Sequence, residues 1–238
     1  MAVFADHVIG TIGGGHLEWS AIASAQAQLP TATEPWHHEV ALGPSLGQCC
    51  GGRVRLRFEP ISAQERDRLS VRLLPTLHPV ALFGGGHVGR ALVQALAPLP
   101  FAVHWVDSRD EVFPPDVPAQ VHTEHSDPVQ AAVADLPAGT HVLIMSFSHA
   151  EDLDIVAACL RRQRERADLC FVGLIGSRTK WASFRHRLVE RGFTDAELAQ
   201  VTCPIGLPGI VDKAPEVIAA SVVAQLLLLR EAVDSPRS

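Results

Sequence analysis

The chain has 238 residues and is 47% hydrophobic, which predicts one or two packed domains. Its formal net charge of −6 argues against nucleic-acid binding, because neutralising phosphates requires a basic face. No Lys or Arg precedes Arg53, and the longest apolar stretch, 217–229, is too short to cross a bilayer, so we expect no targeting leader and no membrane partner.

Short strands and glycine-rich loops alternate in the first 60 or so residues of the chain. The predicted elements there are a helix at His16–Leu29 and strands at His7–Ile12, His38–Leu42 and Arg53–Glu59. A capping box at Ser62 and Glu65 predicts a further helix that runs to about Leu74. Pro75 and Pro79 then mark a boundary, so residues 1–75 are predicted to form a small N-terminal α/β domain.

After Pro79, continuous apolar strands alternate with helices. The predicted strands are Val80–Phe83, Phe101–Asp107, Ala119–His122, His141–Phe147, Leu169–Ile175 and Val201–Ile205. The predicted helices are Val88–Ala97, one begun by Asp127 with Pro128 at its first helical position, Ser148–Arg164 opened by a capping box, Ser177–Glu190, a short helix capped by Thr194 and Glu197, and Pro215–Glu231. This alternation predicts the α/β class, with residues 76–238 forming a Rossmann-type domain around a parallel sheet.

A glycine fingerprint follows the first strand of that domain. Gly84, Gly86 and Gly89 form G-x-G-x-x-G at the start of a helix, and Asp107 ends the next strand about 20 residues later. The pattern predicts an anionic, phosphate-bearing ligand at the helix N-terminus. Asp107 would accept from a ribose hydroxyl, or Arg109 would meet a phosphate. The alternative is a tight turn followed by a solvated carboxylate.

Two adjacent cysteines, Cys49 and Cys50, lie between glycines on both sides. Their spacing does not match a zinc site, but two soft thiols on an open loop suit a thiophilic metal, a persulfide or sulfur transfer. The alternative is that one of them is a small buried hydrophobe. Cys159 and Cys170 are expected in the core, and the role of Cys203 is left open. Five cysteines without framework spacing predict reduced thiols and a cytoplasmic location.

A second glycine-rich turn precedes the first predicted helix. Gly14 and Gly15 end a run of three glycines and could form another anion cradle. Glu18, in the first turn of the following helix, has a simpler interpretation, because acidic side chains stabilise a helix N-terminus.

Two further strand ends carry polar side chains. His149 is placed to face the crevice at the carboxyl end of its strand, although it is equally interpretable as a surface histidine. Ser177 can cap the next helix, and Arg178 and Lys180 add positive charge there. These three residues predict a phosphate or carboxylate clamp, or else a solvated face.

Seven segments, in order over nearly the whole chain, resemble the XdhC/CoxI family of accessory proteins for molybdenum hydroxylases. They are Gly10–Trp19, Leu46–Gly52, Leu82–Gly89, Val106–Arg109, Ser148–Asp154, Gly173–Lys180 and Cys203–Ile210. The resemblance implies a chaperone, rather than a conventional enzyme, that binds molybdenum cofactor, a molybdopterin. It also implies sulfuration with a cysteine desulfurase, delivery to xanthine dehydrogenase and a homodimer.

The resemblance and the motifs together define a predicted cofactor site. Its residues are Gly14, Gly15, Cys49, Cys50, Gly84, Gly86, His87, Gly89, Asp107, Arg109, His149, Ser177, Arg178 and Lys180. Cys49 and Cys50 are the predicted contacts of molybdenum or sulfur, with Cys50 favoured. No residue is assigned a catalytic role.

The chain departs from the family pattern at two places. Family members usually begin with a further strand and an arginine-containing turn, whereas this sequence starts almost at the first glycine segment. Either the start is truncated or the N-terminal sheet lacks an edge strand. The closing helix usually opens with Thr-Pro, but here Ala214 precedes Pro215, which removes a capping side chain worth about 1 kcal/mol.

Two other functions fit some of these motifs. The fingerprint alone would suit an oxidoreductase that uses NAD or NADP, although the chain has no tyrosine and therefore no phenol to act as acid or base. A protein that senses a nucleotide and bridges partners would need no metal chemistry.

Overall fold

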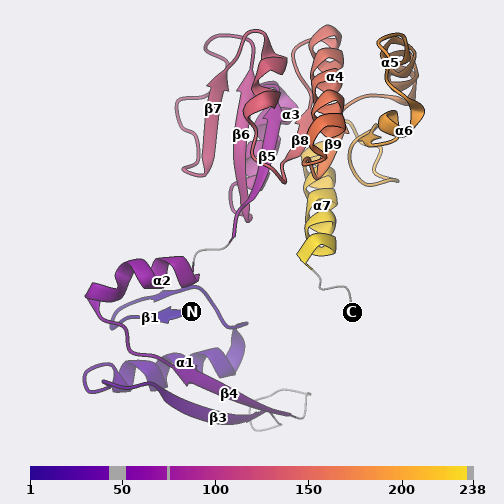
Figure 1. Cartoon of the computed structure of the whole chain (residues 1–238). Helices are drawn as coiled ribbons and strands as arrows, with labels where there is room; N and C mark the ends of the chain where they lie inside the picture. Colours follow the sequence, from indigo (N-terminus) through magenta and orange to yellow (C-terminus); the bar gives the residue numbers. More distant parts are fainter. Residues whose placement is uncertain (43–51, 74–75, 235–238) are drawn as a thin grey trace. The chain divides into compact units, whose positions relative to one another are not determined.

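The computed structural model describes residues 1–42, 52–73 and 76–234 (Figure 1). The chain divides into two compact units, Met1–Pro75 and Thr76–Ser238. No helix in the described ranges is long and apolar enough to cross a membrane.

The first unit contains little buried apolar surface. Its elements are β1 (Ala2–Val3), β2 (Val8–Ile9), α1 (Gly15–Gln28), β3 (Trp36–Leu42), β4 (Gly52–Phe58), the 3-10 turn η2 (Ala63–Glu65) and α2 (Arg66–Leu73). The strands form two separate antiparallel pairs, β1 with β2 and β3 with β4. Trp36 and Phe58 face each other across the second pair, with stacked rings 4.9 Å apart. Ala21 and Ala25 are its buried hydrophobic residues among those described.

The first predicted strand is much shorter than expected. Only Val8–Ile9 is extended and paired, because Gly10 and Gly13 take positive φ angles of 76° and 114° that leave the strand conformation. The partner of Val8–Ile9 is β1, which the sequence pattern did not predict.

The second unit is the predicted Rossmann fold. Its strands are β5 (His78–Phe83), β6 (Phe101–Asp107), β7 (Val121–His125), β8 (His141–Ile144), β9 (Phe171–Leu174) and β10 (Val201–Thr202). They form one six-stranded sheet in the order β10-β9-β8-β5-β6-β7, and every neighbouring pair is parallel. The α/β class with a Rossmann-type sheet is therefore confirmed.

Helices cover both faces of this sheet. They are α3 (His87–Leu96), the 3-10 helix η3 (Val129–Asp135), α4 (His149–Arg166), α5 (Arg178–Glu190), α6 (Asp195–Leu198) and α7 (Pro215–Asp234). One core packs α3 and α7 against residues such as Leu82, Val103 and Trp105. The other packs η3, α4, α5 and α6 against Phe83 and Ile144. Burial on both faces explains the continuous apolar strands.

Three local expectations need correction. Pro128 is not the first residue of an α-helix: its ψ of 138° is extended, and the segment after it is the 3-10 helix η3. The third strand lies at Val121–His125, shifted from the predicted Ala119–His122. Cys170 is exposed just before β9 rather than in the core, whereas Cys159 is fully buried as expected.

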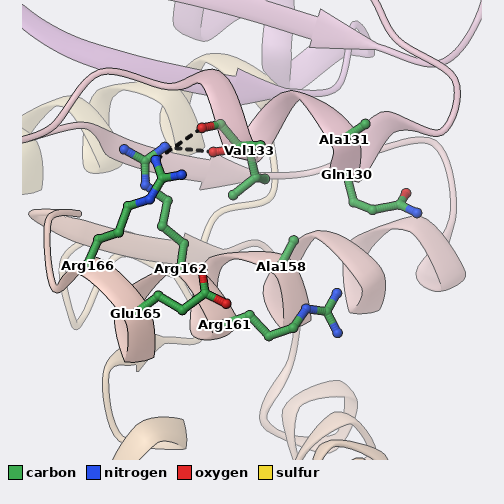
Figure 2. Close-up of a pocket in the computed structure, with 9 residues that line it drawn as sticks. Gln130, Ala131, Val133, Ala158, Arg161, Arg162, Glu165 and Arg166 are labelled. Atoms are coloured by element: carbon green, nitrogen blue, oxygen red, sulfur yellow. Dashed lines mark hydrogen bonds between the residues drawn. The ribbon is translucent and has the colours of Figure 1, made fainter.

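Arg162 fastens η3 to α4 from inside a shallow hollow of about 240 Å³, which Figure 2 shows. Its guanidinium donates to the carbonyl oxygens of Val133 and Leu136, both at 2.7 Å. It also donates to both carboxylate oxygens of Asp168 at 2.8 Å. Because the buried guanidinium of Arg162 is engaged in these hydrogen bonds, we assign the hollow a structural role.

Replacing Arg162 tests this role. Arg162→Met is expected to lower the free energy of unfolding by about 3 kcal/mol, because a carboxylate and two carbonyl oxygens lose their donor. The measurement is urea unfolding followed by circular dichroism. The matched control is Arg161→Met, since Arg161 is exposed and has no partner among the described residues, and its effect should stay within about 0.5 kcal/mol. Equal losses in the two variants would contradict the assignment.

Candidate functional site

The carboxyl edge of the parallel sheet carries the candidate site. The strand order reverses next to β5. The next strand in the chain, β6, lies on one side of β5, and β8 lies on the other. In open α/β sheets, ligands bind at this switch point. The loops after β5 and β8 touch there, because a Cβ on Gly84 would lie 2.1 Å from the carbonyl oxygen of Met145. Gly84 also has a φ of +125°, so only glycine fits this position.

Of the other two fingerprint glycines, Gly89 allows close packing and Gly86 is exposed. A Cβ on Gly89 would lie 2.0 Å from the carbonyl oxygen of Gly84, so α3 packs directly on the turn. The indole N–H of the buried Trp105 donates to the same oxygen at 2.9 Å. A Cβ on Gly86 would meet nothing within 4 Å, and the neighbouring His87 is exposed. Gly86 is thus the point of the loop that a ligand can approach.

The N-terminus of α3 has no side-chain cap among the residues that the structure describes. Its N-cap is Gly86, no side chain bonds to the first amides, and the first turn has no acidic residue. Uncapped amides and the partial positive charge of a helix N-terminus attract anions. The neighbouring helices differ, because Ser148 caps α4 and Ser177 caps α5 with their side chains.

Asp107 is buried at the end of β6, and its carboxylate is saturated by donors of the chain. Its oxygens accept hydrogen bonds from the Gly85 amide at 2.6 Å and from the Arg109 amide at 2.9 Å. The Arg109 guanidinium adds two more at 2.9 Å. Burial alone would raise the pKa of Asp107, but these hydrogen bonds outweigh it and hold the pKa below its ordinary value. A ribose hydroxyl would therefore have to displace one of these donors.

Arg109 extends from Asp107 to an exposed aromatic ring. Its guanidinium carbon lies 4.6 Å from the centroid of the Phe147 ring, which is 65% exposed. Glu151 fixes the loop below, since it accepts from the Phe147 amide at 3.1 Å and from the Ser108 hydroxyl at 2.6 Å. The capping box predicted for α4 is therefore only half formed: Ser148 accepts from the Glu151 amide, while the Glu151 carboxylate bonds elsewhere.

Asp152 is a buried site residue to which the sequence analysis gave no role. One carboxylate oxygen accepts from the amide and hydroxyl of Ser146, at 2.8 and 2.7 Å. The other accepts from the ammonium of Lys180 at 2.6 Å, and Lys180 also donates to the carbonyl of Ile175 at 2.8 Å. Lys180 thus ties the strand ends of β8 and β9 together, and its charge is already paired. The sequence signal that could have revealed this ion pair was an acidic residue after one strand, Asp152, and a basic residue after the next, Lys180.

The remaining predicted crevice residues lie on the surface of the same edge. Ser177 caps α5 by accepting from the Lys180 amide at 3.1 Å. Arg178, the first residue of α5, is exposed and has no partner among the described residues. His149, the first residue of α4, is exposed, and its ring meets that of Phe184 edge to face at 6.2 Å.

The glycine turn of the first unit already holds an anion, the carboxylate of Glu18. Gly14 and Gly15 have φ angles of 76° and 70°. Glu18 accepts from the hydroxyl of Thr11, from the Ile12 amide at 2.7 Å and from the Gly14 amide at 3.1 Å. These bonds, with that from Thr11 strongest, lower the pKa of Glu18. This arrangement agrees with the simpler interpretation of the sequence, in which the Glu18 carboxylate stabilises the start of α1.

The structure describes three of the five cysteines. Cys49 and Cys50 lie outside the described residues. Cys203 is half-buried, and burial raises the pKa of its thiol to about 11 despite the nearby Lys180. The fully buried Cys159 has a pKa raised to about 12 for the same reason. Within the described ranges, no three His, Cys, Asp or Glu side chains are grouped to hold a metal.

Asp107→Asn tests whether the Asp107 carboxylate organises the site. The folded-state pKa of Asp107 lies below its ordinary value of 3.8, so its contribution to stability is full above that value and is lost as pH falls through the folded-state pKa. The variant should lose about 2–3 kcal/mol of unfolding free energy at pH 7, and the difference from the parent should shrink below about pH 4.

Urea unfolding across this pH range provides the measurement. Asp154→Asn is the control, because Asp154 makes a half-exposed ion pair with Arg191 at 2.7 Å, worth at most about 1 kcal/mol. A pH-independent difference for Asp107→Asn would show that the carboxylate charge has no role.

Comparisons with known proteins agree with this architecture. A sequence model of the XdhC Rossmann domain matches residues 80–226. The uncharacterized protein YqeB of Escherichia coli (strain K12) is 27% identical over 235 residues. That alignment covers 97% of this chain but 40% of YqeB, so the chain spans well under half the length of this relative.

Two solved structures align with the chain, and the first of them has a similar fold. A crystal structure of a xanthine dehydrogenase from Bacillus halodurans has a TM-score of 0.76 at 19% identity, covering 97% of this chain and 85% of the other. A Rossmann-fold NAD(P)-binding family protein from Shigella flexneri has a TM-score of 0.42 at 15% identity, covering 66% of this chain and 89% of the other. Because the matched segment, residues 80–226, is more than half of the sequence, this chain belongs to the family defined by the XdhC Rossmann domain.

Proposed function

We propose that this protein binds molybdenum cofactor, supports its sulfuration and delivers it to xanthine dehydrogenase. Membership of the XdhC family supports an accessory role at the level of the family. The observation that carries the proposal is the uncapped N-terminus of α3, where Gly86 faces open space at the switch point of the sheet. In this proposal the cofactor is cargo, and the crevice holds it through its phosphate.

The chemistry of the crevice fits a phosphate group. Amides in the first turn of α3 offer hydrogen bonds to an anion, and no carboxylate in that turn opposes it. His87 and Arg178 are exposed on the helix N-termini that border the same edge. By contrast, the glycine turn of the first unit is filled by Glu18, so we place the phosphate in the Rossmann crevice.

The thiols Cys49 and Cys50 are proposed to contact molybdenum or the incoming sulfur. Thiolates are soft metal ligands and the nucleophilic form of cysteine, which suits contact with the metal or acceptance of sulfur. Cys203 is a poorer choice, because a thiol with a pKa of about 11 is protonated at neutral pH and a weak nucleophile. The partners implied are a cysteine desulfurase as sulfur donor, xanthine dehydrogenase as recipient and a second copy of the chain.

A nicotinamide-dependent oxidoreductase is the alternative, and the geometry of Asp107 weighs against it. That function needs a free carboxylate for the ribose hydroxyls, whereas the oxygens of Asp107 already accept four hydrogen bonds. A protein that senses a nucleotide would face the same constraint at this position.

Gly86→Asp separates ligand binding from folding. The new carboxylate would cap α3 in place of the ligand, so the melting temperature should be unchanged or slightly raised. Affinity for molybdenum cofactor in an anaerobic titration should fall by more than about tenfold, because like charges repel at the phosphate position. Gly86→Asn, with similar shape and no charge, should weaken binding less. Binding of the parent and Gly86→Asp with equal affinity would exclude the α3 site.

The thiol role is tested by a double variant, Cys49→Ala with Cys50→Ala. We expect it to bind the cofactor phosphate but to deliver little sulfurated cofactor, measured as xanthine dehydrogenase activity after transfer to the apo-enzyme. Gly86→Asp serves as the comparison, because it should fail at binding rather than at sulfuration. Full activation by the double variant would rule out both cysteines.

A further inference from the structure

Phe147 is an exposed aromatic ring at the place where the sheet order reverses. It follows β8, and 65% of its surface is open to solvent. Among the large hydrophobic side chains exposed in the described residues of the second unit, Phe147 is the aromatic one. Ligands of open α/β sheets bind at this edge, and an aromatic side chain exposed there is an available contact for one.

The structure holds this ring in a defined position. The Phe147 amide donates to Glu151 at 3.1 Å, and the preceding amide, of Ser146, donates to the buried Asp152 at 2.8 Å. Arg109 lies over one face of the ring at 4.6 Å. The loop is therefore fixed at Phe147 and at the residue before it, and the ligand would find the ring already in place.

One carboxylate connects Phe147 to the anion site. Asp107 accepts from the Gly85 amide, next to the open Gly86, and from the guanidinium of Arg109. Arg109 in turn packs on Phe147. The uncapped N-terminus of α3 and the aromatic ring are thus linked through the same buried carboxylate at the carboxyl edge of the sheet.

We propose that Phe147 is the stacking surface for the planar heteroaromatic ring of a phosphate-bearing ligand. The phosphate binds at α3, and the ring of the ligand lies on the face of Phe147 that Arg109 leaves open. Stacking of a heterocycle on an aromatic side chain tolerates many ring types, since each has a π-face. Where the ring is the pterin of molybdenum cofactor, this inference rests on the proposed function. The base of a nucleotide would stack on Phe147 in the same way.

Three ligands and three variants test the inference with the full chain. The ligands are molybdenum cofactor, ADP and inorganic pyrophosphate, which has no ring. In Phe147→Ala, affinity for the ring-bearing ligand should fall about tenfold, and affinity for pyrophosphate should not change. Phe147→Trp should restore binding of the ring-bearing ligand. Val189→Ala, which shortens an exposed apolar side chain on α5, should behave as the parent.

The outcomes separate this inference from the proposed function. Loss confined to molybdenum cofactor supports both. Loss confined to ADP, in a protein that does not bind the cofactor, supports stacking by Phe147 and refutes the proposed cargo. Unchanged affinity of Phe147→Ala for ring-bearing ligands overturns the stacking role while leaving the cargo intact. Equal loss for all three ligands, pyrophosphate included, also overturns it, because the residue would then act only on the loop.

Discussion

The carboxylate of Asp107 joins the loops that meet at the switch point of the sheet. It accepts one hydrogen bond from the glycine loop and three from Arg109, and it is buried while doing so. A buried charge of this kind is tolerated only when donors surround it. Through these bonds Asp107 holds the loop next to Gly86 and the guanidinium that packs on the ring of Phe147.

A second buried carboxylate, that of Asp152, has the same role at the neighbouring strand end. It ties Ser146 at the end of β8 to Lys180 in the helix after β9. The crevice is therefore braced by two acid–base pairs whose charges are satisfied internally. Among the described residues, groups left for a ligand at this edge include the amides at the start of α3, the exposed ring of Phe147 and the exposed Arg178.

Local patterns in the sequence predicted the Rossmann sheet and the fingerprint glycines, because strand burial and tight turns depend on neighbouring residues. They could not predict that Arg109 would saturate Asp107, since a carboxylate at a strand end has the same sequence pattern whether it faces a ribose or an arginine. The pairing of Asp152 with Lys180 spans 28 residues and depends on strand order. Pro128 failed as a helix start because its preference for the first helical position is only statistical.

We propose above all that the N-terminus of α3 holds the phosphate of molybdenum cofactor. A crystal structure of the protein with this cofactor bound tests it most directly. We expect the phosphate oxygens to lie within hydrogen-bonding distance of the amides that follow Gly86, with the pterin ring against Phe147. A phosphate bound in the first unit or beside the arginines of α4, with the α3 amides facing only water, would contradict it.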